Sequence, residues 1–309
     1  MHQTDNRYIL IKSWGFGFYS DVIAVLGSLL LAEITNRTPI VYWGKNSLFG
    51  SFENFFEPIT LVGIDHLSHQ KDFFPPKWNR ENLAEENLSK WSGEYSRMDP
   101  VSYIGREEEV AVCDFFVGVV DLIPLIPPDH AMYRKSTSEI YRWLINKYLR
   151  PHEEILRRVD AFQRKNLQEP YVAMHIRGSD KVGEITNLDE VNMSFIKFLE
   201  GVDPKIKIFL LTDDARWLNI TRQKFGNSRV VATDCKRTHT NTGTHHLYAC
   251  GEELGKEVMV DAYLASRAGI FIGNGTSGVS LMVSHMKDWQ GRYRLNCEPL
   301  WPSARRLKK

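Results

Sequence analysis

Short β-prone apolar runs alternate with helical segments along most of the chain, and this alternation constrains the fold more than any other feature. The first run, residues 8–12, ends at a glycine turn, after which Ser20 or Asp21 can cap a helix expected at 22–34. A second strand is expected at 40–43. Strand, helix and strand in this order form a βαβ unit, which predicts a parallel sheet.

The same rhythm returns in the second half of the chain. Between the halves we expect an irregular segment at 50–110, a third strand at 110–113, and helices at 138–148 and 152–165. The later elements are strands at 171–176, 207–211, 229–231 and 270–272, and helices at 215–225, at 253–266 and from 277 onward. We place a boundary near Pro151. The sequence thus predicts an α/β chain of two Rossmann-like domains, 1–150 and 151–309, although composition alone would suit any two-domain α/β enzyme.

Composition and charge exclude several classes of function. The 309 residues carry a net charge of only +1, so nothing favours nucleic acid or an acidic membrane surface as a partner. The apolar run near the N-terminus is too short to span or enter a membrane, and we expect a cytoplasmic protein. The four cysteines are scattered without a Cys-x-x-Cys pair, and the sequence contains neither a P-loop nor a complete dinucleotide fingerprint.

The densest run of charged residues directly follows the expected strand at 171–176. It contains His175, Arg177, Asp180, Lys181 and Glu184. In open α/β sheets the carboxyl edge of the strands is where ligands bind. Arg177 offers a planar fork suited to phosphate, Lys181 adds a second cation, and Asp180 or Glu184 can orient these cations or take a proton. A solvated cluster at a strand end would look the same, and residue types alone leave the two readings evenly matched.

Two further strand ends carry polar residues. Asp213 and Asp214 follow the strand at 207–211, where they can border a ligand or cap the next helix. The glycine-rich turn at 273–278 opens a helix, and its backbone N–H groups form a ready anion site.

The spacing His-x-Arg-x-x-Asp-Lys-Val-Gly at 175–183 resembles the donor-binding motif of the core α-1,6-fucosyltransferases and of the bacterial nodulation-factor fucosyltransferases. The resemblance implies that Arg177 holds the β-phosphate of GDP and that His175 lies beside the nucleotide. Asp180, Lys181 and Glu184 become candidates for sugar binding and proton transfer. The chain departs from the eukaryotic enzymes at two points: Gly178 stands where they have a second arginine, and their glutamate lies one residue later than Glu184.

The resemblance continues along the chain in the same order. It implies that Asp213 and Asp214 border the donor pocket and that Asp261 contacts guanine, whose N1–H and amine a carboxylate can accept together. The diphosphate would lie on the turn made by Asn274, Gly275, Thr276 and Ser277. In the first half Gly15 and Gly17 resemble the glycine loop that faces the donor phosphates, and the segment at 73–80 resembles the nodulation-factor enzymes. There Trp78, Asn79 and Arg80 are candidates for binding acceptor sugar, with a structural loop as the alternative for Trp78.

The resemblance implies a GT-B-like fold, with two Rossmann-like domains facing across a cleft, the first on the acceptor side and the second binding the GDP-sugar. The implied activity is inverting transfer of L-fucose from GDP-fucose to a glycan or glycoconjugate. No Asp-x-Asp occurs, so we expect no metal and no other cofactor. His239, His245 and His246 lack a standard metal-ligand spacing and are expected in a mobile loop. The alternatives are transfer of another GDP-sugar, mannose or heptose, and a non-catalytic protein that binds nucleotide or glycan.

Overall fold

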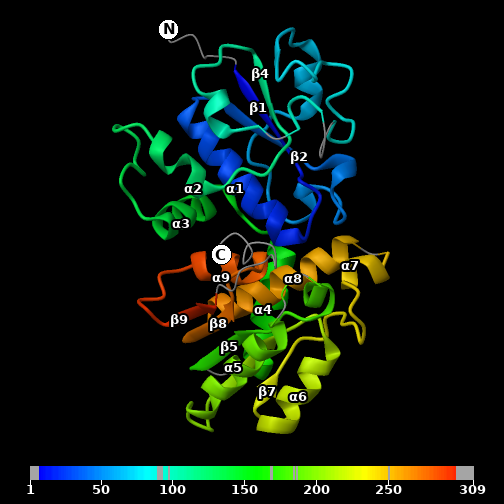
Figure 1. Ribbon diagram of the computed structural model, residues 1–309, viewed down its shortest axis with the longest axis vertical. Coiled ribbons are helices and arrows are strands. Elements are labelled where there is room, and N and C mark those ends of the chain that lie inside the picture. Colours follow the sequence, from blue (N-terminus) through cyan, green and yellow to red (C-terminus); the bar gives the residue numbers. More distant parts are fainter. Residues whose placement is uncertain are drawn as a thin grey trace, which may run out of the picture. The chain divides into compact units, whose positions relative to one another are not determined.

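The computed structural model describes residues 7–88, 93–96, 98–167, 170–183, 185, 187–249 and 251–296 (Figure 1). They fall into two units, Met1–His152 and Glu153–Lys309, each with its own parallel β-sheet. The mixed α/β class expected from the sequence is therefore confirmed. Each unit is described by itself.

The sheet of the N-terminal unit has four parallel strands in the order β2-β1-β4-β3. These are β1 (Tyr8–Lys12), β2 (Thr38–Tyr42), β3 (Phe73–Phe74) and β4 (Val110–Cys113). The two central strands, β1 and β4, are buried at every position, as expected of apolar strands covered on both faces. The strand order reverses between β1 and β4, so a ligand of this unit would bind outside the carboxyl ends of these two strands.

Helix α1 (Phe18–Ile34) lies in the core of this unit, with α2 (Val119–Leu122) and α3 (Thr137–Tyr148) beside it. Almost all of its side chains are buried, because a helix that is apolar on all sides belongs in an interior. Gly27 lets the chain pass unusually close: a Cβ at this position would lie 2.0 Å from the carbonyl oxygen of Val117.

Helix α1 begins earlier than the sequence suggested. Its N-cap is Gly17, which has no side chain to offer, so the expected cap by Ser20 or Asp21 is wrong. Asp21 instead lies in the first turn, fully buried, and accepts hydrogen bonds from the Ser13 hydroxyl and from the N–H groups of Gly15 and Phe16. The irregular segment at 50–110 holds short 3₁₀ turns and the small strand β3, which the sequence reading missed.

The sheet of the C-terminal unit has five parallel strands in the order β7-β6-β5-β8-β9. These are β5 (Tyr171–His175), β6 (Lys207–Leu211), β7 (Val230–Val231), β8 (Ile270–Asn274) and β9 (Tyr293–Asn296). The helices are α4 (Glu153–Asn166), α5 (Leu188–Glu200), α6 (Ala215–Phe225), α7 (Thr244–Leu247), α8 (Gly251–Ser266) and α9 (Gly278–His285). This is a doubly wound order whose switch point lies between β5 and β8.

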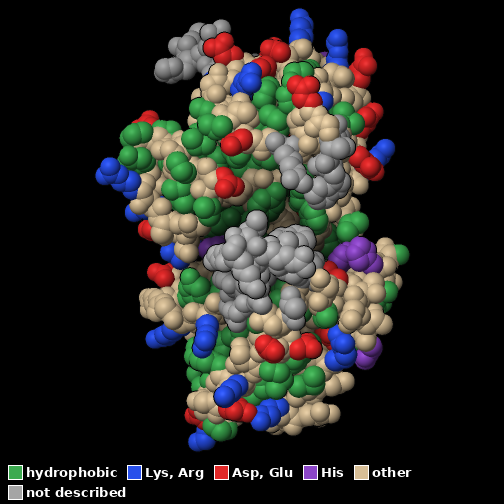
Figure 2. Space-filling model, in the orientation of Figure 1, with side chains coloured by type: hydrophobic (Ala, Val, Ile, Leu, Met, Phe, Trp, Pro, Cys, Tyr) green, Lys and Arg blue, Asp and Glu red, His purple; other side chains and the backbone are tan. Residues whose placement is uncertain are grey.

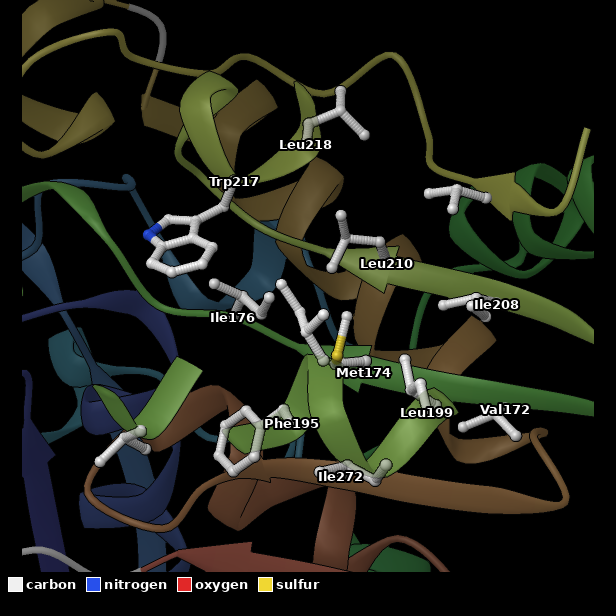
Figure 3. Packing of buried hydrophobic residues seen from close by; sticks show 13 residues of the cluster. Val172, Met174, Ile176, Phe195, Leu199, Ile208, Leu210, Trp217, Leu218 and Ile272 are labelled. Atoms are coloured by element: carbon white, nitrogen blue, oxygen red, sulfur yellow. The ribbon is translucent and has the colours of Figure 1, made fainter. Parts of the chain in front are cut away.

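Helices α5 and α6 cover one face of this sheet, and Figure 3 shows the core that they enclose. Phe195 and Leu199 of α5 and Trp217 of α6 pack with alternate strand residues such as Met174 and Leu210. The other face is covered by α8, as the Tyr171 hydroxyl on β5 donates to the carbonyl of Leu264 on α8. Successive side chains along β5 point to opposite faces of the sheet. His175 therefore points away from the core drawn in Figure 3 and toward the face that α8 and α9 cover.

Charged side chains of both signs are interspersed over the face of the molecule drawn in Figure 2. Histidine side chains gather at the surface over α7 (Figure 2). Among the described residues, no helix combines the length and the apolar character needed to cross a membrane.

Candidate functional site

The residues singled out by sequence converge at the carboxyl edge of the five-stranded sheet. Residues 176–183 leave β5, residues 212–214 leave β6, and the turn at 275–277 leaves β8. Because neighbouring parallel strands end at the same edge, these three segments lie side by side. The first and third flank the switch point between β5 and β8, where open α/β sheets bind their ligands.

Arg177 is held at this edge from several sides. Its guanidinium forms ion pairs with Asp213 and, at 2.7 Å, with Asp180, and its backbone carbonyl accepts a hydrogen bond from the Asn192 amide. The Arg177 side chain is 18% exposed, so a ligand can still reach it. Burial alone would raise the pKa of Asp180, but the Arg177 charge, the Ser179 hydroxyl and the Lys181 charge outweigh it and hold that pKa below its ordinary value.

Ser179 ties the two carboxylates of this cluster together. Its hydroxyl hydrogen-bonds with Asp180 and Asp213, and the Arg177 guanidinium donates to it at 3.3 Å. The backbone of Ser179 has a φ of +46°, a left-handed conformation that a non-glycine residue adopts at a cost. The sequence reading missed Ser179, although it lies inside the motif.

Gly178 cannot be replaced without displacing Asp214. A Cβ on Gly178 would lie 2.4 Å from Asp214 Oδ2 and 2.6 Å from the Asp214 Cβ. The position where the eukaryotic enzymes carry their second arginine is therefore closed to any side chain in this chain.

The two aspartates after β6 have different environments. Asp214 is fully buried; it caps α6 by accepting from the N–H of Arg216 and holds the Arg216 guanidinium through both carboxylate oxygens. Asp213 is the aspartate that faces Arg177. Of the two roles that the sequence left open, Asp214 has the geometry of the cap and Asp213 that of the pocket.

His175 is buried at the end of β5, where its Nδ1 lies 2.7 Å from the hydroxyl of Ser280 on α9. Burial, and then the positive charge of Arg177, lower the pKa of His175 to about 3. The imidazole is therefore neutral at any ordinary pH. Ser280 was not anticipated, because it lies 105 residues from His175 in the sequence.

The turn after β8 leads directly into α9. Asn274 is fully buried, and its side-chain oxygen accepts from the backbone N–H and the hydroxyl of Thr276. Ser277 is the N-cap of α9 but makes no side-chain capping bond. The first N–H groups of α9, with Gly275 and Thr276 partly exposed beside them, can therefore receive an anion.

Asp261 lies on α8, next to the segment that follows β7. Its carboxylate accepts a hydrogen bond of 2.6 Å from the Thr233 hydroxyl, and only 7% of the residue is exposed. Burial raises the pKa of Asp261 to about 6, against the opposing effects of Thr233 and Arg237. Arg237 fixes this segment by donating to the carbonyls of Thr233 and Cys235.

Three residues of the N-terminal unit predicted to bind ligands have structural roles within the unit. The N–H of Gly15 donates to Asp21 and to the Ser13 hydroxyl, and Gly15 has a φ of +82°, which glycine adopts freely. Gly17 is exposed and forms the N-cap of α1.

Trp78 is 1% exposed and donates its indole N–H to Asp114. It therefore cannot stack on an acceptor sugar, which leaves Asn79 and Arg80, both exposed, as the candidates in this segment.

Glu184 and Lys181 are the remaining site residues that the sequence predicted. Glu184 lies outside the described residues, whereas Lys181 lies within them, partly buried in the 3₁₀ turn Ser179–Gly183. Within the part of the chain that the structure describes, no group of three His, Cys, Asp or Glu residues could hold a metal ion.

The fold is similar to that of solved fucosyltransferases. The NodZ α-1,6-fucosyltransferase co-crystallised with GDP is 20% identical, with 90% of this chain and 91% of that chain covered and a TM-score of 0.61. POFUT1 in complex with GDP is 15% identical over 93% and 97% of the two chains, with a TM-score of 0.54. A mutant of Arabidopsis thaliana FUT1 with GDP is 12% identical over 91% and 68%, with a TM-score of 0.58.

No known family and no curated protein sequence matches the chain. The solved structures thus confirm the fold that the motif resemblance implied, that of GT-B-like fucosyltransferases.

Proposed function

We propose that this chain is a glycosyltransferase that moves L-fucose from GDP-fucose to a glycan or glycoconjugate acceptor. The observation that carries the proposal is the Arg177 guanidinium, fixed by Asp180 and Asp213 at the switch point of a sheet. The fold is that of NodZ and POFUT1, whose structures contain GDP or GDP-fucose.

In this proposal the C-terminal unit binds the donor. The diphosphate lies against Arg177 and the N-terminus of α9, both of which stabilise negative charge. His175 is neutral and held by Ser280, so it can lie beside the nucleotide without adding charge. Asp261 has a pKa of about 6 and is mostly ionised at neutral pH, as a carboxylate must be to accept both the N1–H and the amine of guanine.

The proposed reaction is a single displacement. The acceptor hydroxyl attacks the anomeric carbon of GDP-β-L-fucose while Arg177 and the α9 turn stabilise the departing diphosphate, which inverts the configuration and gives an α-linked fucoside. The N-terminal unit would bind the acceptor. Permanently charged Arg177 and backbone N–H groups can neutralise the leaving group, and we therefore propose that the reaction needs no metal ion.

The test is release of nucleoside diphosphate from GDP-fucose, GDP-mannose and UDP-sugars, with and without EDTA, by the native chain and by Arg177→Ala. We expect GDP from GDP-fucose alone, unchanged by EDTA, and a loss of about 100-fold or more in the variant, as for other groups that stabilise transition-state charge. Release from GDP-mannose instead would move the assignment to another GDP-sugar. A native chain that does not bind GDP would refute the proposal.

A further inference from the structure

The proposed transfer needs a group to accept the proton of the acceptor hydroxyl, and the carboxylates facing Arg177 are poorly suited to this. Asp180 and Asp213 are both ion-paired with its guanidinium, and the pKa of Asp180 lies below its ordinary value. A carboxylate stabilised as an anion in this way is a weak base, because the ideal pKa of a general base lies near the working pH.

The loop between β7 and α8 brings a histidine to the same cluster. Thr238 forms an isolated parallel β-bridge with Asp214, and the side-chain oxygen of Asn241 accepts a hydrogen bond of 3.1 Å from the Arg216 guanidinium. These two contacts fix the start of this loop to the carboxyl edge of the sheet. Further along, a Cβ on Gly243 would lie 2.6 Å from Cε1 of His245 and 3.4 Å from Cγ of Asp180. The imidazole and the carboxylate therefore pack against the same glycine.

His245 is in the protonation state that a base requires. Partial burial, then the neighbouring His246 and the cations Arg177 and Lys181, lower its pKa below the ordinary value, while Asp180 acts in the opposite direction. These groups, from the segment that follows β5 and from α7 itself, are the charged and titratable neighbours that act on the ring. The lowered pKa keeps the His245 ring in its neutral, proton-accepting form to a lower pH than for an ordinary histidine.

We propose that His245 is the general base of the transfer reaction. An imidazole nitrogen of His245 takes the proton of the acceptor hydroxyl as the oxygen forms its bond to the anomeric carbon. The bond from that carbon to the β-phosphate oxygen breaks, and its electron pair leaves with GDP. Asp180 stabilises the imidazolium that forms, which later returns its proton to water.

Among the residues that the structure describes, the other basic groups at this edge fit the role less well; Glu184, a candidate from the sequence, lies outside them. His175 is buried, hydrogen-bonded to Ser280 and has a pKa of about 3. Asp261 has a pKa of about 6, but it accepts a hydrogen bond from Thr233 and is itself proposed to contact guanine. His246 is the exposed neighbour, its ring centroid 4.1 Å from that of His245, and so provides a matched control in the same short helix.

The inference rests on the proposed function, and the experiment separates the two. Transfer from GDP-fucose is measured with His245→Gln, His246→Gln and the native chain at saturating donor, together with the affinity of each for GDP. We expect kcat of His245→Gln to fall about 100-fold or more, the usual contribution of a general base, with unchanged GDP affinity. His246→Gln should keep the native kcat at a pH above the histidine range, because loss of His246 changes only the pKa of His245.

The dependence of kcat on pH gives a second readout that a structural role would not change. In the native chain and in His246→Gln, kcat should decrease as the pH falls through the pKa of a histidine, because the protonated ring cannot accept a proton. That decrease should be absent in His245→Gln. Retained activity, a retained acid limb, or lost GDP binding in His245→Gln would overturn the base assignment; a native chain inactive with GDP-fucose would instead refute the proposed function.

Discussion

Replacement of Gly178 by alanine tests the packing that shapes the arginine loop. The added Cβ would meet Asp214 at 2.4 to 2.6 Å, about 1 Å closer than an ordinary van der Waals contact. Overpacking of this kind costs about 1–3 kcal/mol, and displacing Asp214 from the N-cap of α6 costs about 1 kcal/mol more. We therefore expect Gly178→Ala to lower the free energy of unfolding of the C-terminal unit by about 2–4 kcal/mol.

The measurement is calorimetric unfolding. For a unit of this size 1 kcal/mol corresponds to about 2–4 °C, so the melting temperature should fall by roughly 5–15 °C. GDP affinity should fall as well, because the Ser179 N–H donates to the same Asp214. Gly183→Ala is the matched control from the end of the 3₁₀ turn that follows Gly178, since a Cβ there has nothing within 4 Å. Equal stability of the two variants would show that Gly178 and Asp214 are not packed as described.

Two further substitutions test Asp261 and Trp78. The pKa of Asp261 is about 6 in the folded chain, against 3.8 for the free group. The contribution of Asp261 to the stability of the folded chain therefore falls as the pH rises from 3.8 to about 6. Asp261→Asn should therefore raise the melting temperature more at pH 7.5 than at pH 5 while weakening GDP binding; an equal effect at both pH values would contradict the buried charge. Trp78→Phe removes the N–H that binds Asp114 and should cost about 1–3 kcal/mol in denaturant unfolding. The KM for the acceptor should not change, and an increase would restore Trp78 as a sugar-binding residue.

The strands other than β3 and β9 were predictable because each is a short apolar run bounded by turn residues. Helix α6 was expected at the residues where it lies, since Asp214 begins it and Gly226 ends it. Helix α5 was not predicted, although Leu188, Val191 and Phe195 have helical spacing. Strand β9 was missed as a four-residue run of mixed polarity.

The convergence of Arg177, Asp180 and Asp213 also follows from sequence, because neighbouring parallel strands end at one edge. What the sequence could not reveal depends on distances between residues remote in the chain. Examples are the fit of Gly178 against Asp214, the burial of Trp78 on Asp114, and the approach of His245 to Asp180. No local pattern encodes such contacts, since they depend on how separate loops pack once the sheet has formed.

Asp21 makes the two Rossmann-like units unequal. In the N-terminal unit its carboxylate accepts hydrogen bonds from the N–H groups of Gly15 and Phe16 in the loop before α1. The carboxylate therefore takes the position that a phosphate group would need at this loop. In the C-terminal unit, α9 begins at Ser277 without a side-chain cap. Under the proposed function, this difference between the two described loops predicts that each chain binds one nucleotide, in the C-terminal unit.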